Sequence, residues 1–479
     1  MNLRQKIVKG VIWSVIQSWG SRVVSLIVFF LLARLLEPEI FGVVALAGVF
    51  VAFMDVFIDQ GFSTAIIQRH QLEVGHLDTA FWINVTIGLI LTVFGITAAG
   101  SVANFFGQPQ LASIIEWLST GFFLNAFSSV QDAILQRKFA FKALAVRSLL
   151  AGIISGVVGV TMALMNFGVW SLVAQLLTHQ LSRGVVLWWA SDWRPGFNVS
   201  RRHFSELFSF GINIVGIRIF DFINSKSDDL LIGYFLGNVA LGYYTIAYRL
   251  VSVIIDLTRS ISQVAMTGFS ALQQEPERLQ RIFYVATQLA SFIAFPVFLG
   301  LAALSPALVR SLLGIQWLLS IPIIQILALS GILQTINPFN TAIIAAMGKP
   351  LWSLKINVMN SICNVVAFAL VVQWGVITVA AAYVICSYLF LPIYLWAVRE
   401  LIYIKAAIYF RQFTAPLIAS LAMVAVVLGT QDSLGNFVGT QALLAICIVI
   451  GTLVYTLLIM LLAPKLFQQV LNLVFSPTS

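Results

Sequence analysis

Fourteen apolar segments, each long enough to cross a lipid bilayer as a helix, follow one another along this chain. A membrane-spanning helix needs about 20 mostly apolar residues. Only 9% of the 479 residues are charged, against about 25% in soluble domains, which is too few to cover a water-facing surface. The sequence therefore predicts an all-α integral membrane protein with about 14 transmembrane helices. The predicted spans are residues 11–33, 41–66, 80–100, 111–134, 146–166, 169–190, 207–225, 239–260, 282–304, 319–346, 354–372, 376–397, 413–430 and 439–463.

The basic residues are divided unequally between the two sides of this predicted arrangement. If the N-terminus is cytoplasmic, 19 of the 27 lysines and arginines fall in cytoplasmic segments and 3 in outside loops. Positive charges concentrate on the cytoplasmic side of membrane proteins. The sequence therefore predicts that both termini are cytoplasmic. The net charge of +9 follows from this bias and does not indicate a nucleic-acid partner.

A short internal repeat indicates how the spans are grouped. A shift of 200 residues places LLARLLEPEIFGVVALA on LIGYFLGNVALGYYTIA, with the identical pairs Leu31/Leu231, Leu36/Leu236, Gly42/Gly242 and Ala47/Ala247. Six spans in each half would give two copies with the same direction of insertion, a pattern found in transporters. Chance similarity between apolar helices is the alternative. We expect two pseudo-symmetric six-helix bundles, 1–190 and 207–411, a cytoplasmic linker loop, 191–206, and two additional transmembrane helices with a cytoplasmic tail, 412–479.

Polar residues recur at helical spacing inside several predicted spans. A charged side chain at the bilayer centre costs about 2.5–3.5 kcal/mol on insertion scales, so these stripes are expected to face a shared interior or a water-filled cavity. Both halves contribute stripes, which places the expected cavity between them. The stripes are Ser14, Ser18, Ser21, Arg22 and Ser25; Asp55, Asp59 and Ser63; Asn125, Ser129, Asp132 and Gln136; Arg218, Asp221 and Ser225; Thr245, Arg249, Ser252, Asp256, Arg259 and Gln263; and Asn357, Asn360, Ser361 and Asn364.

The stripes also have structural interpretations. Serine and asparagine often join helices by hydrogen bonds without binding a ligand. Arg22 with Asp55, or Arg218 with Asp221, could form purely structural ion pairs. Arg183, near the cytoplasmic end of its span, could extend its charge to the membrane surface, as long basic side chains do.

The remaining chemistry-bearing residues show no pattern typical of a metal or catalytic site. The cysteines Cys363, Cys386 and Cys447 lie in apolar runs and lack metal-ligand spacing. The four histidines, His70, His76, His179 and His203, are scattered along the sequence. No metal site, no cofactor and no catalytic residue is expected.

Several segments identify a family that the chain resembles. These are LLARLLEPEIFGVVALA, LQRKFAFKALAVRS at 135–148, LGYYTIAYRLVSVIIDLTRSISQVAMTGFSALQ at 241–273, FPVFLGLAALSPALVRSLLGIQWLLSIPIIQILALSGILQ at 295–334 and AAMGKP at 345–350. The chain resembles the polysaccharide-transporter family of lipid-linked oligosaccharide flippases (the Wzx type), in the superfamily that also contains the MATE drug exporters. The tyrosine-rich stretch at 241–249 resembles the exopolysaccharide and lipopolysaccharide branch.

The resemblance implies a flippase of the bacterial inner membrane that moves undecaprenyl-pyrophosphate-linked repeat units through a cationic cavity by alternating access. Arginine recognises phosphate through its planar fork, and sugars need polar contacts. The candidate substrate-binding cations are Arg22, Arg218 and Arg249. Candidate acids for coupling to H⁺ or Na⁺ are Asp55, Asp59 and Asp256, and the candidate polar lining is Asn125, Asn357, Asn360 and Asn364. The expected partners are the lipid-linked substrate, membrane lipids, a polysaccharide polymerase and glycosyltransferases.

Two other functions remain as alternatives. A multidrug exporter of the same superfamily would favour a net acidic cavity for organic cations, whereas Arg22, Arg218 and Arg249 offset the acids here. A membrane-embedded polysaccharide polymerase would be expected to present acids or metal ligands in a sizeable loop, and the predicted loops are short. Transport without enzymatic chemistry is the favoured interpretation.

Overall fold

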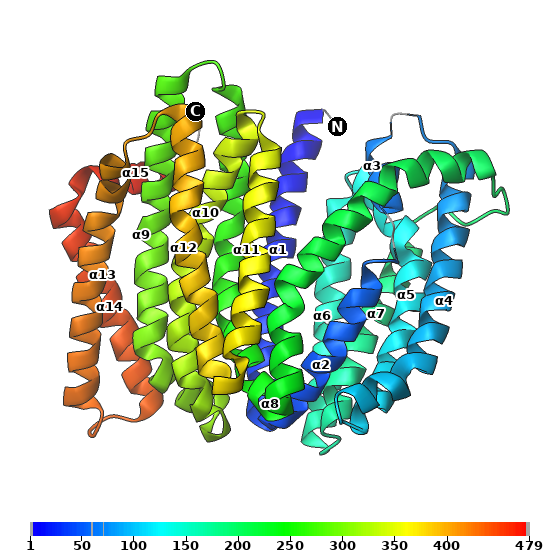
Figure 1. Ribbon diagram of the computed structural model, residues 1–479, viewed down its shortest axis with the longest axis horizontal. Coiled ribbons are helices and arrows are strands. Elements are labelled where there is room, and N and C mark those ends of the chain that lie inside the picture. Colours follow the sequence, from blue (N-terminus) through cyan, green and yellow to red (C-terminus); the bar gives the residue numbers. More distant parts are fainter. Residues whose placement is uncertain (1–2, 59–60, 70, 476–479) are drawn as a thin grey trace. The chain divides into compact units, whose positions relative to one another are not determined.

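The computed structural model describes residues 3–58, 61–69 and 71–475, with side chains described outside 3–18, 207–215, 217, 257–264, 267 and 473–475. This part of the chain is helical and contains no strand (Figure 1). The α-helices are α1 (Leu3–Leu35), α2 (Pro38–Asp55), α3 (Phe62–Gln68), α4 (Val74–Phe105), α5 (Gln110–Arg137), α6 (Phe141–Leu164), α7 (Val169–Ala190), α8 (Arg201–Ala271), α9 (Pro276–Leu308), α10 (Ile321–Ala346), α11 (Pro350–Val371), α12 (Val376–Ile402), α13 (Ala406–Leu434), α14 (Thr440–Leu462) and α15 (Pro464–Phe475).

Ten helical segments of the described chain are long and apolar enough to cross a membrane. They lie in α2, α4, α6, α8, in α9 with the short π-helix that follows it, and in α10 to α14. The expected all-α, multi-pass membrane architecture is therefore confirmed. Helices α1, α5 and α7 also hold predicted spans but are not among the ten, so the count of fourteen stays a prediction.

The predicted span 41–66 is wrong as a single helix. Helix α2 ends at Asp55, and α3 begins at Phe62 after a turn in which Gly61 has φ +80°. This left-handed backbone conformation suits glycine, which has no Cβ to clash. The break leaves Asp55 at a helix end. By contrast, the predicted span 319–346 is not broken: α10 continues through Pro338, and Pro322 lies in its first turn, where no backbone N–H is needed.

Helix α8 is longer than the sequence predicted. Its 71 residues include the segment 226–236, which was expected to be part of an outside loop. The helical backbone is interrupted at Gly237, with φ 80° and ψ −179°. The stretch between the predicted spans 207–225 and 239–260 is therefore helical with a kink, and one candidate span, Arg218–Asp256, crosses it.

The chain forms two compact units, Met1–Gly242 (unit 1) and Tyr243–Ser479 (unit 2). In unit 1, α4 packs on α5, and α6 packs on both α1 and α7. In unit 2, α9 packs on α10 and α13, and α13 packs on α14. The contact between α13 and α14 includes buried Met423, Val427 and Cys447. The domain boundaries expected from the sequence stay predictions.

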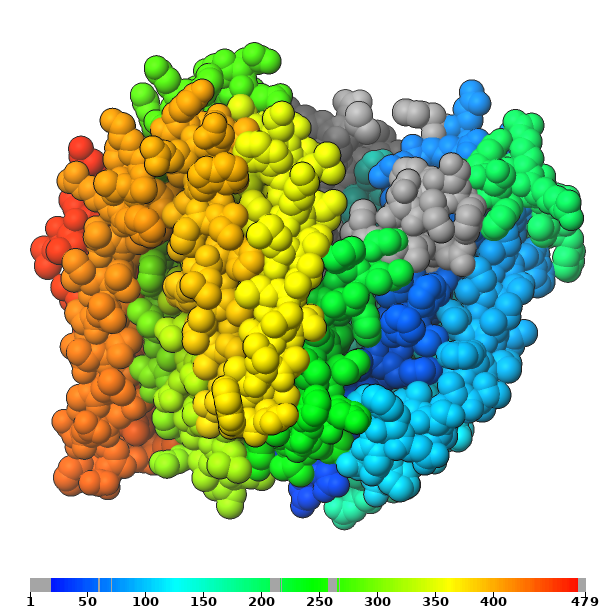
Figure 2. Space-filling view, viewed as in Figure 1, coloured from blue at the N-terminus to red at the C-terminus, as the bar shows by residue number. Residues whose placement is uncertain are grey.

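The outer faces of α11 and α12, in yellow and orange in Figure 2, expose many large apolar side chains. Leu370 is 69% exposed on α11 and Leu389 is 62% exposed on α12. Such a surface would be costly in water, and hydrocarbon solvates it without penalty. These helices therefore have the surface of membrane-spanning segments.

The segment 191–206, expected as a linker loop, is fixed to the first turns of α4 within unit 1. The indole Nε1 of Trp82 donates a hydrogen bond to the carbonyl oxygen of Gly196 at 2.8 Å, and the Gly196 N–H donates to Asp78 at 3.0 Å. The ring of Trp82 also stacks on Phe197, with 5.2 Å between ring centroids. The segment is therefore held by specific contacts to α4.

Two glycines of the sequence repeat mark a close backbone contact inside unit 1. A Cβ added to Gly42 would lie 1.8 Å from the carbonyl oxygen of Asn238, and one added to Gly242 would lie 1.9 Å from that of Pro38. Positions 38 and 238, like 42 and 242, differ by the same 200 residues as the repeat. The contact is therefore reciprocal, as a local two-fold axis requires.

We expect Gly42→Ala and Gly242→Ala each to lower the free energy of unfolding by about 1–3 kcal/mol or more. This is the typical cost of overpacking, and here the new methyl group would clash with backbone atoms. The measurement is thermal unfolding of the purified protein in detergent. Gly48→Ala is the matched control on the same helix, since a Cβ there meets nothing within 4 Å. Unchanged melting of both test variants would contradict the close contact.

Candidate functional site

A polar cavity of about 260 Å³ lies inside unit 1. Side chains of α5, α7 and α8 surround it, together with the end of α2 and the start of α3. We call it the α5 cavity, because α5 supplies half of its lining. The lining residues are Asp55, Ile58, Ser63, Asn125, Ser129, Asp132, Ala133, Gln136, Arg183 and Arg218.

The polar stripe of α5 lies along this cavity over three turns. Residues spaced three or four apart share one face of a helix, and all four members of the predicted stripe line the cavity: Asn125, Ser129, Asp132 and Gln136. The stripe is also tied to α4, because the side-chain amide of Asn84 donates a hydrogen bond to the hydroxyl of Ser129 at 2.9 Å. The periodicity in the sequence therefore identified one complete wall of the cavity.

Asp132 links three helices through two ion pairs. Its Oδ1 lies 2.5 Å from Nη1 of Arg147 on α6, and its Oδ2 lies 2.5 Å from Nη2 of Arg183 on α7. The side chains of Asp132 and Arg147 are only 10% and 13% exposed. Because desolvation of an unpaired charge is costly, each of these buried charges needs its partners to stay ionised inside the protein. The three charges together carry one net positive charge.

The sequence indicated neither basic partner of Asp132. Arg183 could have extended its charge to the membrane surface, but it pairs with Asp132 and lines the cavity. Arg147 lies in α6 and is mostly buried. Neither pairing has a sequence signal, because the partners lie 15 and 51 positions from Asp132.

A second pair of opposite charges completes the cavity. Asp55, at the end of α2, and Arg218, on α8, both line it, and Arg218 acts electrostatically on Asp55. Arg22 is half-buried on α1 and is not among the described residues of the lining. Asp221 is exposed and also lies outside it. The structure thus places Asp55, Asn125 and Arg218 together, while Asp59 lies outside the described residues.

The candidates in unit 2 lie on α8 and α11. Arg249 is exposed and Asp256 is half-buried on α8. On α11, exposed Asn357 accepts a hydrogen bond from the hydroxyl of Tyr394 at 2.5 Å. Buried Asn364 donates to the side-chain oxygen of Asn360 at 3.3 Å. This asparagine stripe therefore makes hydrogen bonds within α11 and to α12.

We expect Asp132→Asn to lower the free energy of unfolding by about 3–5 kcal/mol, the usual cost of removing one partner from a buried ion pair. Thermal unfolding in detergent measures the effect. Asp192→Asn, an exposed acid, is the matched control and should be near neutral. Adding Arg183→Gln to Asp132→Asn should recover part of the loss; strict additivity of the two changes would contradict the pairing.

Proteins of several bacteria are similar in sequence to this chain over most of its length. The chain is 25% identical over 480 residues to the teichuronic acid biosynthesis protein TuaB of Bacillus subtilis, with 98% of this chain and 99% of TuaB covered. It is 28% identical to the succinoglycan biosynthesis transport protein ExoT of Rhizobium meliloti, covering 98% and 95% of the two chains. The lipopolysaccharide biosynthesis protein WzxC of Escherichia coli is 27% identical, with 75% and 74% covered.

Solved structures share the fold at lower sequence identity. The lipid II flippase MurJ in an inward closed conformation superposes with a TM-score of 0.77 at 17% identity, covering 95% of this chain and 99% of MurJ. An inward-facing multidrug resistance transporter of the MATE family gives 0.63 at 15% identity, with 81% and 98% covered. The fold is therefore of the MurJ and MATE type.

A family model described as "Polysaccharide biosynthesis protein" matches residues 31–322. This range is more than half of the chain, and it includes the whole α5 cavity. The chain belongs to this polysaccharide biosynthesis protein family.

Proposed function

We propose that this chain is a flippase that moves undecaprenyl-pyrophosphate-linked oligosaccharide repeat units across the bacterial inner membrane, for exopolysaccharide or lipopolysaccharide biosynthesis. The observation that carries the proposal is the α5 cavity, which two arginines and a row of hydrogen-bonding side chains line together. The cavity lies in a multi-pass membrane protein of the polysaccharide biosynthesis family. The relatives named as transport and flippase proteins support the same assignment.

The lining matches the two chemical parts of such a head group. Guanidinium groups bind phosphate oxygens through paired, charge-assisted hydrogen bonds, a role that suits Arg218 and Arg183. Asn125, Ser129 and Gln136 present amide and hydroxyl groups of the kind that bind sugar hydroxyls. The apolar tail of the lipid would stay in the bilayer, where it needs no protein site.

The remaining sequence candidates keep their proposed roles. Arg22 and Arg249 are proposed as further cations for the phosphate groups, and Asn357, Asn360 and Asn364 as polar lining. Asp55, Asp59 and Asp256 are proposed acids for coupling to H⁺ or Na⁺. Because Asp55 shares its cavity with Arg218, a bound substrate phosphate would compete with Asp55 for the same arginine. Substrate binding would then favour protonation or cation binding at Asp55.

The charge of the cavity argues against drug export. Among the described residues, with Arg147 included, the charges at the cavity are two acids and three arginines, a net positive balance that repels organic cations. A polysaccharide polymerase and glycosyltransferases are proposed partners, since they would consume and supply the repeat unit. Transport itself requires no catalytic residue.

Replacement of Arg218 tests the binding site. Hydrogen bonds to charged groups contribute about 1.5–3 kcal/mol, so we expect Arg218→Ala to reduce export roughly tenfold or more at normal membrane levels. Arg218→Lys should keep partial function because it retains the charge but not the planar fork. Polysaccharide export in a strain lacking the chromosomal copy is the measurement, with exposed Arg201→Ala as control. Full export by Arg218→Ala would refute the assignment.

Cysteine labelling tests the proposed orientation, with both termini cytoplasmic. In a variant without the three native cysteines, Asn198→Cys should resist a membrane-impermeant maleimide added to intact cells, whereas Phe437→Cys should react. Both positions are exposed: Asn198 in the 191–206 segment, and Phe437, at 85% exposure, between α13 and α14. Labelling of Asn198→Cys from outside would reverse the proposed orientation.

A further inference from the structure

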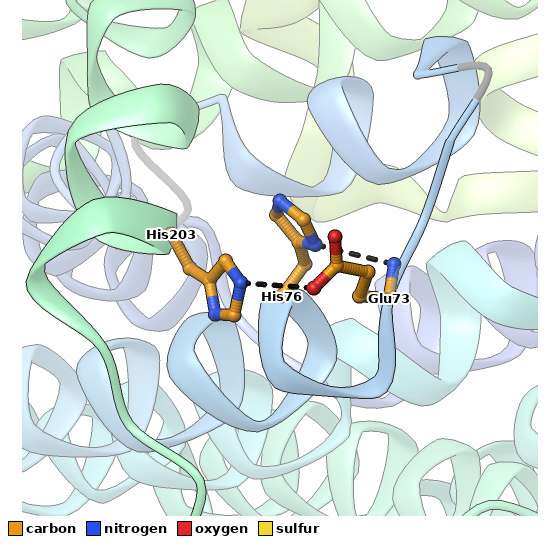
Figure 3. Close-up of side chains that lie close together, drawn as sticks. All are labelled: Glu73, His76 and His203. Carbon is orange, nitrogen blue, oxygen red and sulfur yellow. Dashed lines mark hydrogen bonds and ion pairs between the residues drawn. The ribbon is translucent and has the colours of Figure 1, made fainter.

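Two histidines that are far apart in the sequence have their rings in contact at one end of unit 1, tilted by 39°. His76 is in the first turn of α4 and His203 in the first turn of α8, with ring centroids 4.1 Å apart. Glu73, the residue before α4, places its carboxylate beside both rings (Figure 3). One potential ligand atom from each of these three residues lies within 4.8 Å of the other two. We call them the Glu73–His76–His203 cluster.

The spacing within this cluster suits a tetrahedral metal ion. A site with metal–ligand bonds of about 2.0–2.1 Å has neighbouring ligand atoms roughly 3.3–3.4 Å apart. Nε2 of His203 lies 3.4 Å from Oε2 of Glu73. These two ligands therefore already have the separation that a shared metal ion would impose.

The tautomer of His76 is set by Glu206. Nε2 of His76 lies 3.1 Å from Oε2 of Glu206. Glu206 also pairs with Arg69 and Arg202, and a carboxylate held by two guanidinium groups accepts hydrogen bonds. Nε2 of His76 therefore donates to Glu206, and the ring lone pair is on Nδ1. A carboxylate commonly holds the other ring nitrogen of a metal-ligating histidine in this way.

Nδ1 of His76 is held at the cluster by local structure. It accepts a hydrogen bond of 3.2 Å from the backbone N–H of Glu73, in a capping box that fixes both residues at the start of α4, and a bound ion would take the place of this N–H. His76 is 1% exposed, so its ring cannot swing into solvent. His203 fits against α4 only because Gly75 lacks a side chain: a Cβ there would lie 2.4 Å from the His203 ring. The sequence thus leaves space for the second imidazole.

We propose that Glu73, Nδ1 of His76 and Nε2 of His203 form a binding site for a divalent transition-metal ion of the zinc class. Two imidazoles and one carboxylate suit zinc and its neighbours, whereas Mg²⁺ and Ca²⁺ prefer oxygen ligands. Nε2 of His203 would bind the ion through its lone pair, so the single ring proton of the neutral imidazole would be on Nδ1. The Glu73 side chain is 65% exposed, so water can reach the ion and complete its coordination.

A metal ion bound at this site would link the first turn of α8 to the start of α4. Without metal, that junction is held by Glu206, which pairs with Arg69 and Arg202. A bound ion adds a bond from each helix to one common centre, which resists separation of the two helix ends. Metal binding would therefore raise the thermal stability of the protein. The proposal concerns a different part of unit 1 from the α5 cavity and does not depend on the proposed transport function.

The experiment uses full-length protein in detergent, purified without a polyhistidine tag and stripped with EDTA. We expect zinc titration, followed by elemental analysis, to give one zinc per chain and an increase in melting temperature, with no increase for magnesium. Glu73→Gln and His203→Gln should each weaken zinc binding at least tenfold. His179→Gln, a histidine on α7 outside the cluster, is the matched control and should leave zinc binding unchanged.

Two further comparisons keep the test decisive. Glu73 is mostly exposed and glutamine can still accept the capping hydrogen bond, so Glu73→Gln reports on the site even if His203→Gln fails to fold. Glu206→Gln should weaken zinc binding by about 10–100-fold, the usual effect of losing the carboxylate that orients a ligating histidine. Equal zinc affinity in wild type and Glu73→Gln, or no bound zinc in wild type, would overturn the proposal.

Discussion

The burial of charge within a largely apolar protein is the constraint on which the structure of unit 1 depends. Asp132 satisfies it by accepting one arginine from α6 and another from α7. An isolated charge at this depth would be costly, and a pair is tolerated only with good geometry and further hydrogen bonds. The position of α5 relative to α6 and α7 is therefore tied to one carboxylate. The same carboxylate also lines the α5 cavity.

Breaks in regular helix geometry shape the region around this carboxylate. The turn between α2 and α3 ends a helix at Asp55 and returns the chain with Ser63 at the same cavity. The helical backbone of α8 is interrupted at Gly237. Irregular backbone at membrane depth is tolerated where it is buried in protein or lines a polar cavity. The paired glycines Gly42 and Gly242 allow the helices beside these breaks to approach closely.

A second set of polar and charged side chains positions the segment 191–206 at one end of unit 1. Trp82 and Asp78 hold Gly196, and Glu206 holds His76, so this segment is docked on α4 at several points. Glu206 also pairs with Arg69 and Arg202. The polar residues here therefore act mainly in positioning the start of α8, and the proposed metal ion would strengthen the same junction.

The sequence by itself determined the membrane architecture, because apolar segment length and charge scarcity act locally and can be read along the chain. It also determined one wall of the site, since the spacing of Asn125, Ser129, Asp132 and Gln136 defines a helix face. It did not determine the partners of that face. Arg183 was interpreted as a surface residue, and His76 and His203 as unrelated, because pairing between distant helices leaves no periodic signal. Only the tertiary structure, which sets α7 beside α5 and α8 beside α4, decided those contacts.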